Sequence, residues 1–173
     1  MILYLVCDIS GSMTENGKNM LVRGIARATE QYLRLFGGAA SIKLVLWNKT
    51  ASVVDWNIDD EFPEAMLECS RNPSGSSDAP GQNIPLCELI QTMPEGKYLF
   101  LTDGWWMSGN DDVSRLIREM PPDRVRIFLI GADANPLLEG NKSVFSTDDF
   151  FAALDGWLPD TDDTDANGEK DEW

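Results

Sequence analysis

The sequence predicts an α/β fold, a Rossmann-like three-layer sandwich in which helices cover both faces of a central, mostly parallel sheet. Two observations point to this fold. Short apolar runs rich in β-favouring residues alternate along the chain with segments whose apolar residues recur every three or four positions. Such alternation is typical of strand–helix–strand units, whose crossovers make neighbouring strands parallel. One pair of runs is separated only by a short turn, which predicts a hairpin and hence one antiparallel edge strand.

The first half of the chain is expected to hold three strands and one long helix. The uninterrupted apolar run before Asp8 is typical of a strand that is buried on both faces. Apolar residues from Leu21 to Phe36 recur at helical spacing, and the glycine pair at 37–38 ends the pattern. The expected elements are a strand at 2–7, a helix at 18–36, and strands at 41–47 and 51–56 that are joined by a turn at Asn48 and Lys49.

The second half is expected to continue the alternation after a loop. Residues 71–83 are rich in Gly, Pro, Ser and Asn, as in a loop, and Pro63 interrupts a weaker helical pattern before them. The run 146–149 resembles a capping box that opens the last helix, in which we expect Phe150 and Phe151 to belong to the core. The expected elements are a helix at 60–69, a helix at 84–93, a strand at 97–102, a helix at 113–120, a strand at 124–130, a short strand at 144–145 and a final helix that reaches residue 158.

Length and charge divide the chain into a folded part and a tail. The 173 residues suffice for one domain with a sizeable core, which we expect at residues 1–158. Residues 159–173 are acidic and contain almost no apolar side chains, so we expect them to form a disordered acidic tail. The formal net charge is −15, and a protein this acidic repels nucleic acid and anionic membranes. We therefore expect neither nucleic acid nor a membrane as a partner.

The cysteine and histidine content indicates the compartment and excludes some metals. The chain has three widely spaced cysteines and no histidine. This pattern lacks the ligand spacing of a zinc site and favours a reducing compartment. The apolar run at the N-terminus has no basic leader and is too short for a signal peptide or a membrane span. We therefore expect a cytoplasmic protein without a soft-metal site.

Two aspartates follow strands of the predicted sheet. Asp8 ends the first apolar run and precedes Ser10 and Ser12, and Asp103 directly follows the strand at 97–102. The carboxyl ends of parallel strands meet at one edge of a sheet, where ligands gather in such folds. Carboxylate and hydroxyl oxygens suit a hard divalent cation that keeps some of its waters. An alternative is that Asp8 and the serines form only a polar turn or helix cap through bonds to the local backbone.

These residues carry a resemblance to a known family. The segment Asp8-Ile9-Ser10-Gly11-Ser12 resembles the D-x-S-x-S motif of the von Willebrand factor A (vWA) domain family, and Thr102-Asp103-Gly104 resembles its second acidic loop. The order of elements over residues 1–158 agrees with the family as well. The resemblance implies a metal-ion-dependent adhesion site (MIDAS) for Mg²⁺, or for Mn²⁺ or Ca²⁺. In such a site Ser10 and Ser12 bind the metal directly, Asp8 and Asp103 act directly or through water, and an Asp or Glu of a protein partner completes the coordination.

The family's third metal-binding loop, typically G-G-T-D before a helix, has no unique counterpart in this chain. The run Gly75-Ser76-Ser77-Asp78 keeps a hydroxyl, since Ser77 would replace the threonine. The run Gly81-Gln82-Asn83 lies at a better distance from the next helix, and there Asn83 would supply an amide oxygen or only cap that helix. Both alignments stay open, so the third-loop ligand is either Ser77 or Asn83.

Two tryptophans follow the second aspartate directly. Trp105 and Trp106 are expected on a loop at the metal edge, and tryptophan is enriched where proteins bind other proteins. We predict that they form part of the partner-binding surface. The alternative is that one or both pack beneath the loop.

The resemblance implies a binding module rather than an enzyme. Single-domain cytoplasmic members of the family recruit or regulate partner proteins in multi-protein systems, often beside an AAA-type ATPase, a kinase or a phosphatase. One alternative is a Mg²⁺-dependent phosphohydrolase that uses Asp8 as the nucleophile, but its usual second aspartate is Ser10 here and a dedicated lysine is missing from the pattern. Another alternative is a regulatory subunit that recruits its partner through the acidic tail. The absence of histidine excludes a histidine-based acid–base mechanism.

Overall fold

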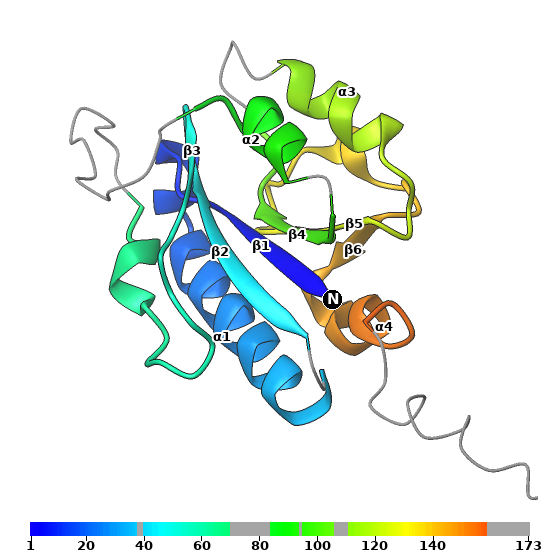
Figure 1. Cartoon of the computed structure of the whole chain (residues 1–173). Helices are drawn as coiled ribbons and strands as arrows, with labels where there is room; N and C mark the ends of the chain where they lie inside the picture. Colours follow the sequence, from blue (N-terminus) through cyan, green and yellow to red (C-terminus); the bar gives the residue numbers. More distant parts are fainter. Residues whose placement is uncertain (38–39, 70–83, 94, 106–110, 159–173) are drawn as a thin grey trace, which may run out of the picture.

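The computed structural model confirms the predicted α/β fold and describes residues 1–37, 40–69, 84–93, 95–105 and 111–158 (Figure 1). Its six-stranded sheet has the order β3-β2-β1-β4-β5-β6. All neighbouring strands pair in parallel except β2 and β3, which form the predicted antiparallel hairpin at one edge. The strands are β1 (Ile2–Asp8), β2 (Ser41–Trp47), β3 (Ala51–Val53), β4 (Lys97–Thr102), β5 (Val125–Leu129) and β6 (Val144–Ser146).

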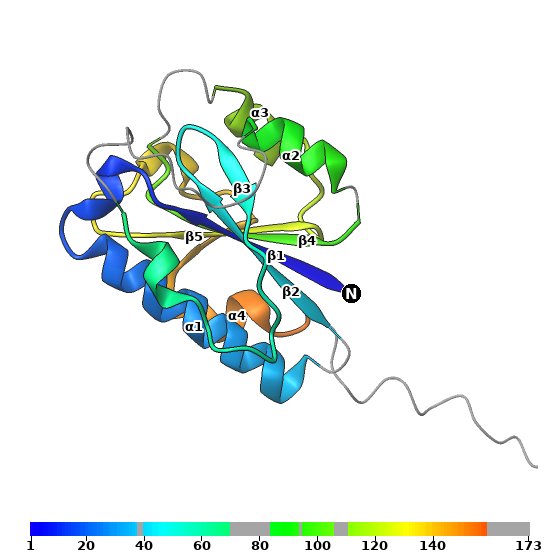
Figure 2. The same ribbon diagram turned by 60° about the vertical axis from the view of Figure 1, so that its left-hand side comes forward.

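Helices cover both faces of the sheet, as predicted. Figure 2 shows α1 and α4 on one face and α2 and α3 on the other. The α-helices are α1 (Lys18–Phe36), α2 (Leu86–Thr92), α3 (Asp111–Glu119) and α4 (Phe150–Leu154). The 3₁₀ turns in the described segments are η1 (Gly11–Thr14), η2 (Glu64–Leu67), η3 (Pro136–Leu138) and η4 (Thr147–Asp149). Among the described residues, none of the helices has the length and apolar character needed to cross a bilayer.

The central strand β1 contributes to two separate hydrophobic cores. Successive side chains of a strand point to opposite faces of its sheet. Leu3, Leu5 and Cys7 accordingly pack in the core beneath α1 and α4, whereas Tyr4 and Val6 pack in the core beneath α2 and α3. This double burial explains why β1 is a continuous apolar run, and it confirms Cys7 as a small core residue. The strand is therefore a rigid support for the aspartate at its end.

Several predicted boundaries are wrong, and local contacts explain them. The predicted helix at 60–69 is only the 3₁₀ turn η2, which begins directly after Pro63. The predicted helix at 84–93 begins two residues later, because Ile84 instead forms a β-bridge with Ala51 at the end of the sheet. The strand predicted at 51–56 ends at Val53.

The final helix is shorter than predicted. Ser146 does cap this segment, since its hydroxyl accepts a hydrogen bond from the Asp148 amide, but the first turn is the 3₁₀ turn η4. The α-helix then ends at Leu154, just before Gly156 adopts a positive φ of 66°. Phe150 packs against the core as predicted, but Phe151 is 64% exposed, so its predicted core position is wrong. The predicted acidic tail lies outside the described residues.

Candidate functional site at the carboxyl edge of the sheet

Asp8 is the last residue of β1 and lies at the carboxyl edge of the sheet, between Trp47 of β2 and the end of β4. Its side chain is only 3% exposed. One carboxylate oxygen, Oδ1, accepts a 2.9 Å hydrogen bond from the Ser10 amide. The other, Oδ2, accepts a 2.7 Å hydrogen bond from the hydroxyl of Thr102, the last residue of β4. The neighbouring strand and the following turn therefore fix the orientation of this carboxylate.

The two serines of the motif lie beside this aspartate. The chain leaves β1 through Ile9 and turns into the 3₁₀ turn η1, and both serines are half-buried there. The Ser10 and Ser12 hydroxyl oxygens lie 3.2 Å apart. Thus Asp8, Ser10 and Ser12 come together in one short turn, as the sequence predicts. Thr102 adds a hydroxyl from the adjacent strand.

Asp8 is a buried carboxylate without a cationic partner within salt-bridge distance among the described residues. Burial raises the pKa of its carboxyl group, and the hydrogen bonds from Ser10 and Thr102 oppose this effect. The charge of Asp103 raises the pKa further. An ionised carboxylate that is removed from water and has no counter-ion is costly in free energy. Asp8 is therefore a place where a bound cation would lower the free energy of the folded protein.

Asp103, unlike Asp8, has a cationic partner within the described part of the chain. It follows β4 directly and is completely buried. Its Oδ2 accepts a 2.9 Å hydrogen bond from the ammonium of Lys18, and its Oδ1 accepts one from the Trp105 amide at 3.1 Å. Asp8 and Asp103 thus meet at one edge of the sheet, as predicted, but in different electrostatic environments.

Lys18 is the main residue of this edge that sequence reasoning did not identify. It is the first residue of α1, and its side chain is only 2% exposed. Its ammonium lies 2.9 Å from Oδ2 of Asp103 and 2.9 Å from Oδ1 of Asp133. Burial tends to lower the pKa of Lys18, but the hydrogen bonds and charges of the two aspartates outweigh burial and raise it. The same contact lowers the pKa of Asp133.

Asp133 could have been found from the sequence, whereas the role of Lys18 could not. Asp133 lies in the turn after β5, so the rule that ligands gather at strand carboxyl ends also applies to it. Lys18 has no such signal, because a lysine at the start of an amphipathic helix normally extends into water. Only the tertiary structure brings its ammonium between the two carboxylates.

Asn135 links the loop after β5 to the loop after β4. Its amide group donates a 3.0 Å hydrogen bond to the Gly104 carbonyl, and its backbone amide donates to the Asp103 carbonyl at 2.8 Å. The Asn135 side-chain oxygen also caps the 3₁₀ turn η3 by accepting from the Leu137 amide at 3.0 Å. Because these bonds connect the two loops directly, a shift of the loop after β5 would also displace the backbone of Asp103.

The structure describes some of the predicted site residues and not others. Trp105 is half-exposed, and its indole nitrogen donates a 2.9 Å hydrogen bond to the Asp133 carbonyl, so one ring edge is fixed at the carboxyl edge of the sheet. Trp106, Ser77 and Asn83 lie outside the described residues. The choice between Ser77 and Asn83 as third-loop ligand therefore stays open.

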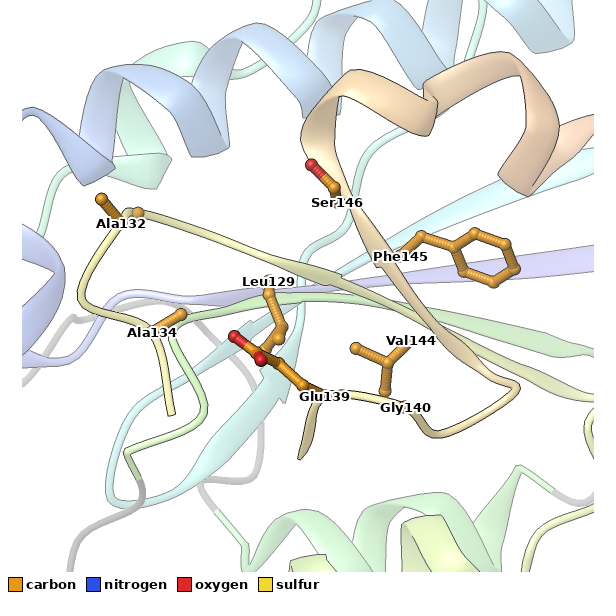
Figure 3. Close-up of a pocket in the computed structure, with 9 residues that line it drawn as sticks. Leu129, Ala132, Ala134, Glu139, Gly140, Val144, Phe145 and Ser146 are labelled. Carbon is orange, nitrogen blue, oxygen red and sulfur yellow. The ribbon is translucent and has the colours of Figure 1, made fainter. Parts of the chain in front are cut away.

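A cavity of about 360 Å³ lies next to this edge, at the end of β5 and β6. Figure 3 shows the side chains of Leu129, Glu139 and Val144 extending towards its centre, whereas the Phe145 ring points away. Gly131 and Ala134 line the same cavity and belong to the loop that holds Asp133. The cavity thus has a mixed polar and apolar lining with the Glu139 carboxylate, and it shares no lining residue with the oxygen cluster around Asp8.

The oxygen cluster of Asp8, Ser10, Ser12 and Thr102 has the chemistry of a hard-cation site. A carboxylate and neutral hydroxyls are ligands that Mg²⁺ and Ca²⁺ accept, and their small number leaves positions for water or for a ligand. Among the described residues, no group of three or more His, Cys, Asp or Glu side chains could hold a metal ion. Metal binding at this edge would therefore depend on the serine hydroxyls.

Comparison of the sequence with known proteins does not assign a family. No family model matches the chain, and no curated protein matches it.

Proposed function

We propose that this protein is a metal-dependent protein-binding module that resembles vWA domains. A Mg²⁺ ion, or Mn²⁺ or Ca²⁺ in its place, would bind at Asp8, Ser10 and Ser12, and a partner protein would be recognised through an Asp or Glu side chain. The observation that carries the proposal is the buried Asp8 carboxylate, which has no cationic partner among the described residues and lies beside two hydroxyls 3.2 Å apart.

Each residue of the cluster has a distinct part in this proposal. Asp8 supplies the charge that attracts the ion, and Ser10 and Ser12 supply neutral oxygen ligands. Thr102 does not need to bind the ion, because its hydrogen bond orients the Asp8 carboxylate. When bound, the ion supplies an open coordination position that a partner carboxylate can fill. Asp103 would act through water or directly, and Trp105 would contact the partner beside the metal.

A phosphohydrolase that uses Asp8 as its nucleophile is the second candidate, and Lys18 is the observation that favours it. The structure brings a lysine to the same edge, although the sequence pattern has no dedicated lysine. Its ammonium, however, bonds to Asp103 and Asp133, and the position of the usual second aspartate is Ser10. We therefore favour the binding module and expect no Mg²⁺-dependent hydrolysis of p-nitrophenyl phosphate.

The cellular setting is proposed from the family resemblance alone. It suggests a cytoplasmic multi-protein system, in which the module recruits or regulates an AAA-type ATPase, a kinase or a phosphatase. A regulatory subunit that binds its partner through the acidic residues 159–173 is the competing proposal. Deletion of those residues separates the two, since only the metal-dependent module keeps its partner without the tail.

The first experiment measures metal binding directly. Thermal unfolding of the wild type and of Asp8→Asn is followed in Mg²⁺, Mn²⁺, Ca²⁺ and EDTA, with Asp59→Asn as a control that removes the same charge from an exposed position. We expect a divalent ion to raise the unfolding temperature of the wild type and of Asp59→Asn but not of Asp8→Asn. Equal responses of the wild type and Asp8→Asn would place the ion elsewhere and overturn the proposal.

The second experiment identifies the partner. Wild type and Asp8→Asn are used for affinity capture from the native cell extract, each with Mg²⁺ and with EDTA. We expect the partner to be retained only by the wild type in Mg²⁺. Retention of the same protein under all four conditions would show that the partner binds elsewhere on the protein, away from the proposed metal site.

A further inference from the structure

A buried lysine beside a proposed metal site is unusual, because its positive charge repels the ion. Lys18 is 2% exposed and bonds to the fully buried Asp103 at 2.9 Å and to Asp133 at 2.9 Å. Asp133 is held in place by Asn16, whose amide donates to Oδ2 at 3.3 Å. The ammonium therefore joins the start of α1 to the loops after β4 and β5.

A glycine in the loop after β5 leaves space for the buried Lys18 side chain. Gly131 adopts a φ of 95°, and a Cβ atom at this position would lie 2.8 Å from Cε of Lys18 and 2.9 Å from Oδ1 of Asp133. Only glycine both tolerates this conformation and leaves this space. This close fit indicates that the local backbone is specifically arranged to hold the Lys18 side chain in this position.

Lys18 also changes the charge that a bound ion meets. Asp103 directly follows Thr102, whose hydroxyl donates a 2.7 Å hydrogen bond to the Asp8 carboxylate, so both carboxylates lie at the same end of adjacent strands. While Lys18 neutralises Asp103, the charge of Asp8 is not compensated by a cationic side chain among the described residues. A divalent ion on Asp8 then keeps a net positive charge, which favours an incoming carboxylate.

We propose that Lys18 sets the charge of the metal site, so that the site binds its ion weakly and a partner carboxylate strongly. This inference rests on the proposed metal-dependent binding. Lys18 acts through Asp103 and is a positioning residue, not a metal ligand. Without it, the charge of Asp103 would add to that of Asp8, so the ion would bind more tightly but would attract a carboxylate less.

The test uses two probes, Mn²⁺ for the ion and acetate for the partner carboxylate. The enhancement of water proton relaxation by bound Mn²⁺ gives the metal affinity, and its decrease on addition of acetate gives the affinity of the loaded site for a carboxylate. For Lys18→Met we expect Mn²⁺ affinity to rise about tenfold and acetate affinity to fall about threefold or more. Lys142→Met, which removes an exposed lysine, is the matched control and should behave as the wild type.

A second variant keeps the test decisive if Lys18→Met does not fold. Asp133→Asn removes a half-exposed carboxylate that pairs with Lys18, so that Asp103 becomes the only charged partner of the ammonium among the described residues. The expected changes in affinity are therefore opposite to those of Lys18→Met. Mn²⁺ affinity should fall and acetate affinity should rise. Variants in which the two affinities stay at wild-type values, or change in the same direction, overturn the role of Lys18. Absence of Mn²⁺ binding by the wild type would instead overturn the proposed function.

Discussion

At the scale of single residues, the two strand-ending aspartates show how the environment decides the state of a carboxylate. Asp8 and Asp103 follow adjacent parallel strands, and both are buried. Asp103 bonds to the Lys18 ammonium, whereas Asp8 accepts hydrogen bonds only from neutral groups among the described residues. A cation thus offsets the cost of burying the charge of Asp103, whereas neutral hydrogen bonds offset only part of that cost at Asp8. This difference has consequences for stability that can be measured.

The stability of the metal-free protein should depend on the ionisation of Asp8. Burial raises its pKa in the folded state above the ordinary value of 3.8, so the unfolded chain releases this proton first as the pH rises. The free energy of unfolding of the wild type should therefore fall relative to that of Asp8→Asn in EDTA as the pH rises above 3.8, until the folded protein also loses this proton. Urea unfolding of both proteins at each pH measures this difference.

A saturating divalent ion should reduce this pH dependence, because it favours the charged carboxylate. Comparing wild type with Asp8→Asn cancels the titration of the other acidic groups. A difference between the two proteins that is flat with pH would contradict the effect of burial on Asp8.

Gly131 offers a direct test of the space around Lys18. Gly131→Ala adds both the strain of a positive φ and a contact with Lys18 and Asp133, whereas Gly140→Ala adds only the strain, since nothing lies within 4 Å of a Cβ at Gly140. We expect a loss of about 1 kcal/mol for Gly140→Ala and of about 2–4 kcal/mol for Gly131→Ala. Chemical unfolding of both variants measures the difference, and equal losses would show that the contact is relieved without cost.

The sequence predicted only part of the candidate site. Asp8, Ser10 and Ser12 could be placed together because they are close in sequence and follow a buried strand, and Asp103 could be placed by the edge rule. The Lys18 ammonium could not be placed, because its burial depends on a glycine more than one hundred residues away and on two loops that meet only in the folded chain. Such contacts leave no periodic pattern in the sequence.

At the scale of elements, strong periodicity and buried apolar runs were sufficient to predict the bounds of helices and strands. Bounds that are set by contacts with other parts of the chain were not predicted. The helix at 18–36 and the strands at 41–47 and 97–102 have the predicted bounds. Where the end of a segment depends on tertiary contacts, the observed bounds differ from the predicted ones. The predicted helix at 84–93 begins two residues later because the Ile84 carbonyl accepts a 2.7 Å hydrogen bond from the Ala51 amide and the Ile84 amide donates one to the Ala51 carbonyl at 3.2 Å. This β-bridge uses the carbonyl that a helix beginning at Ile84 would need.

The short element η3 depends on Asn135, which also joins two loops of the site. Asn135→Ala removes the cap of η3 and the bond to the Gly104 carbonyl, whereas Ser146→Ala removes only a cap. We expect Ser146→Ala to lower the free energy of unfolding by about 1 kcal/mol and Asn135→Ala by about 2 kcal/mol or more. Chemical unfolding measures both values. Only Asn135→Ala should also weaken the response of the unfolding temperature to Mg²⁺, and equal responses would show that the loop after β5 does not support the proposed metal site.

At the scale of the whole molecule, charge opposes the proposed recognition. The chain carries a net charge of −15, yet the partner is proposed to present a carboxylate. A long-range field of the same sign slows the approach of an acidic ligand, and salt weakens this effect over a Debye length of about 10 Å at 0.1 M. Under the proposed function, recognition would therefore come from the short-range attraction of the metal, and the acidic residues 159–173 would reduce the affinity for weak acidic ligands.

Truncation after Pro159 tests how far the negative charge of the C-terminal residues opposes the binding of an acidic ligand to the proposed metal site. It removes seven acidic residues and one lysine and changes the net charge from −15 to −9. We expect the truncated chain to bind acetate at the Mn²⁺-loaded site more tightly than the full chain at low ionic strength, by about twofold, and equally at about 0.5 M salt, where the field is screened. Asp8 should remain essential in both chains. Loss of metal-dependent partner capture on truncation would instead show that residues 159–173 themselves bind the partner, because removal of a repulsive charge cannot weaken an acidic ligand's attraction to the metal.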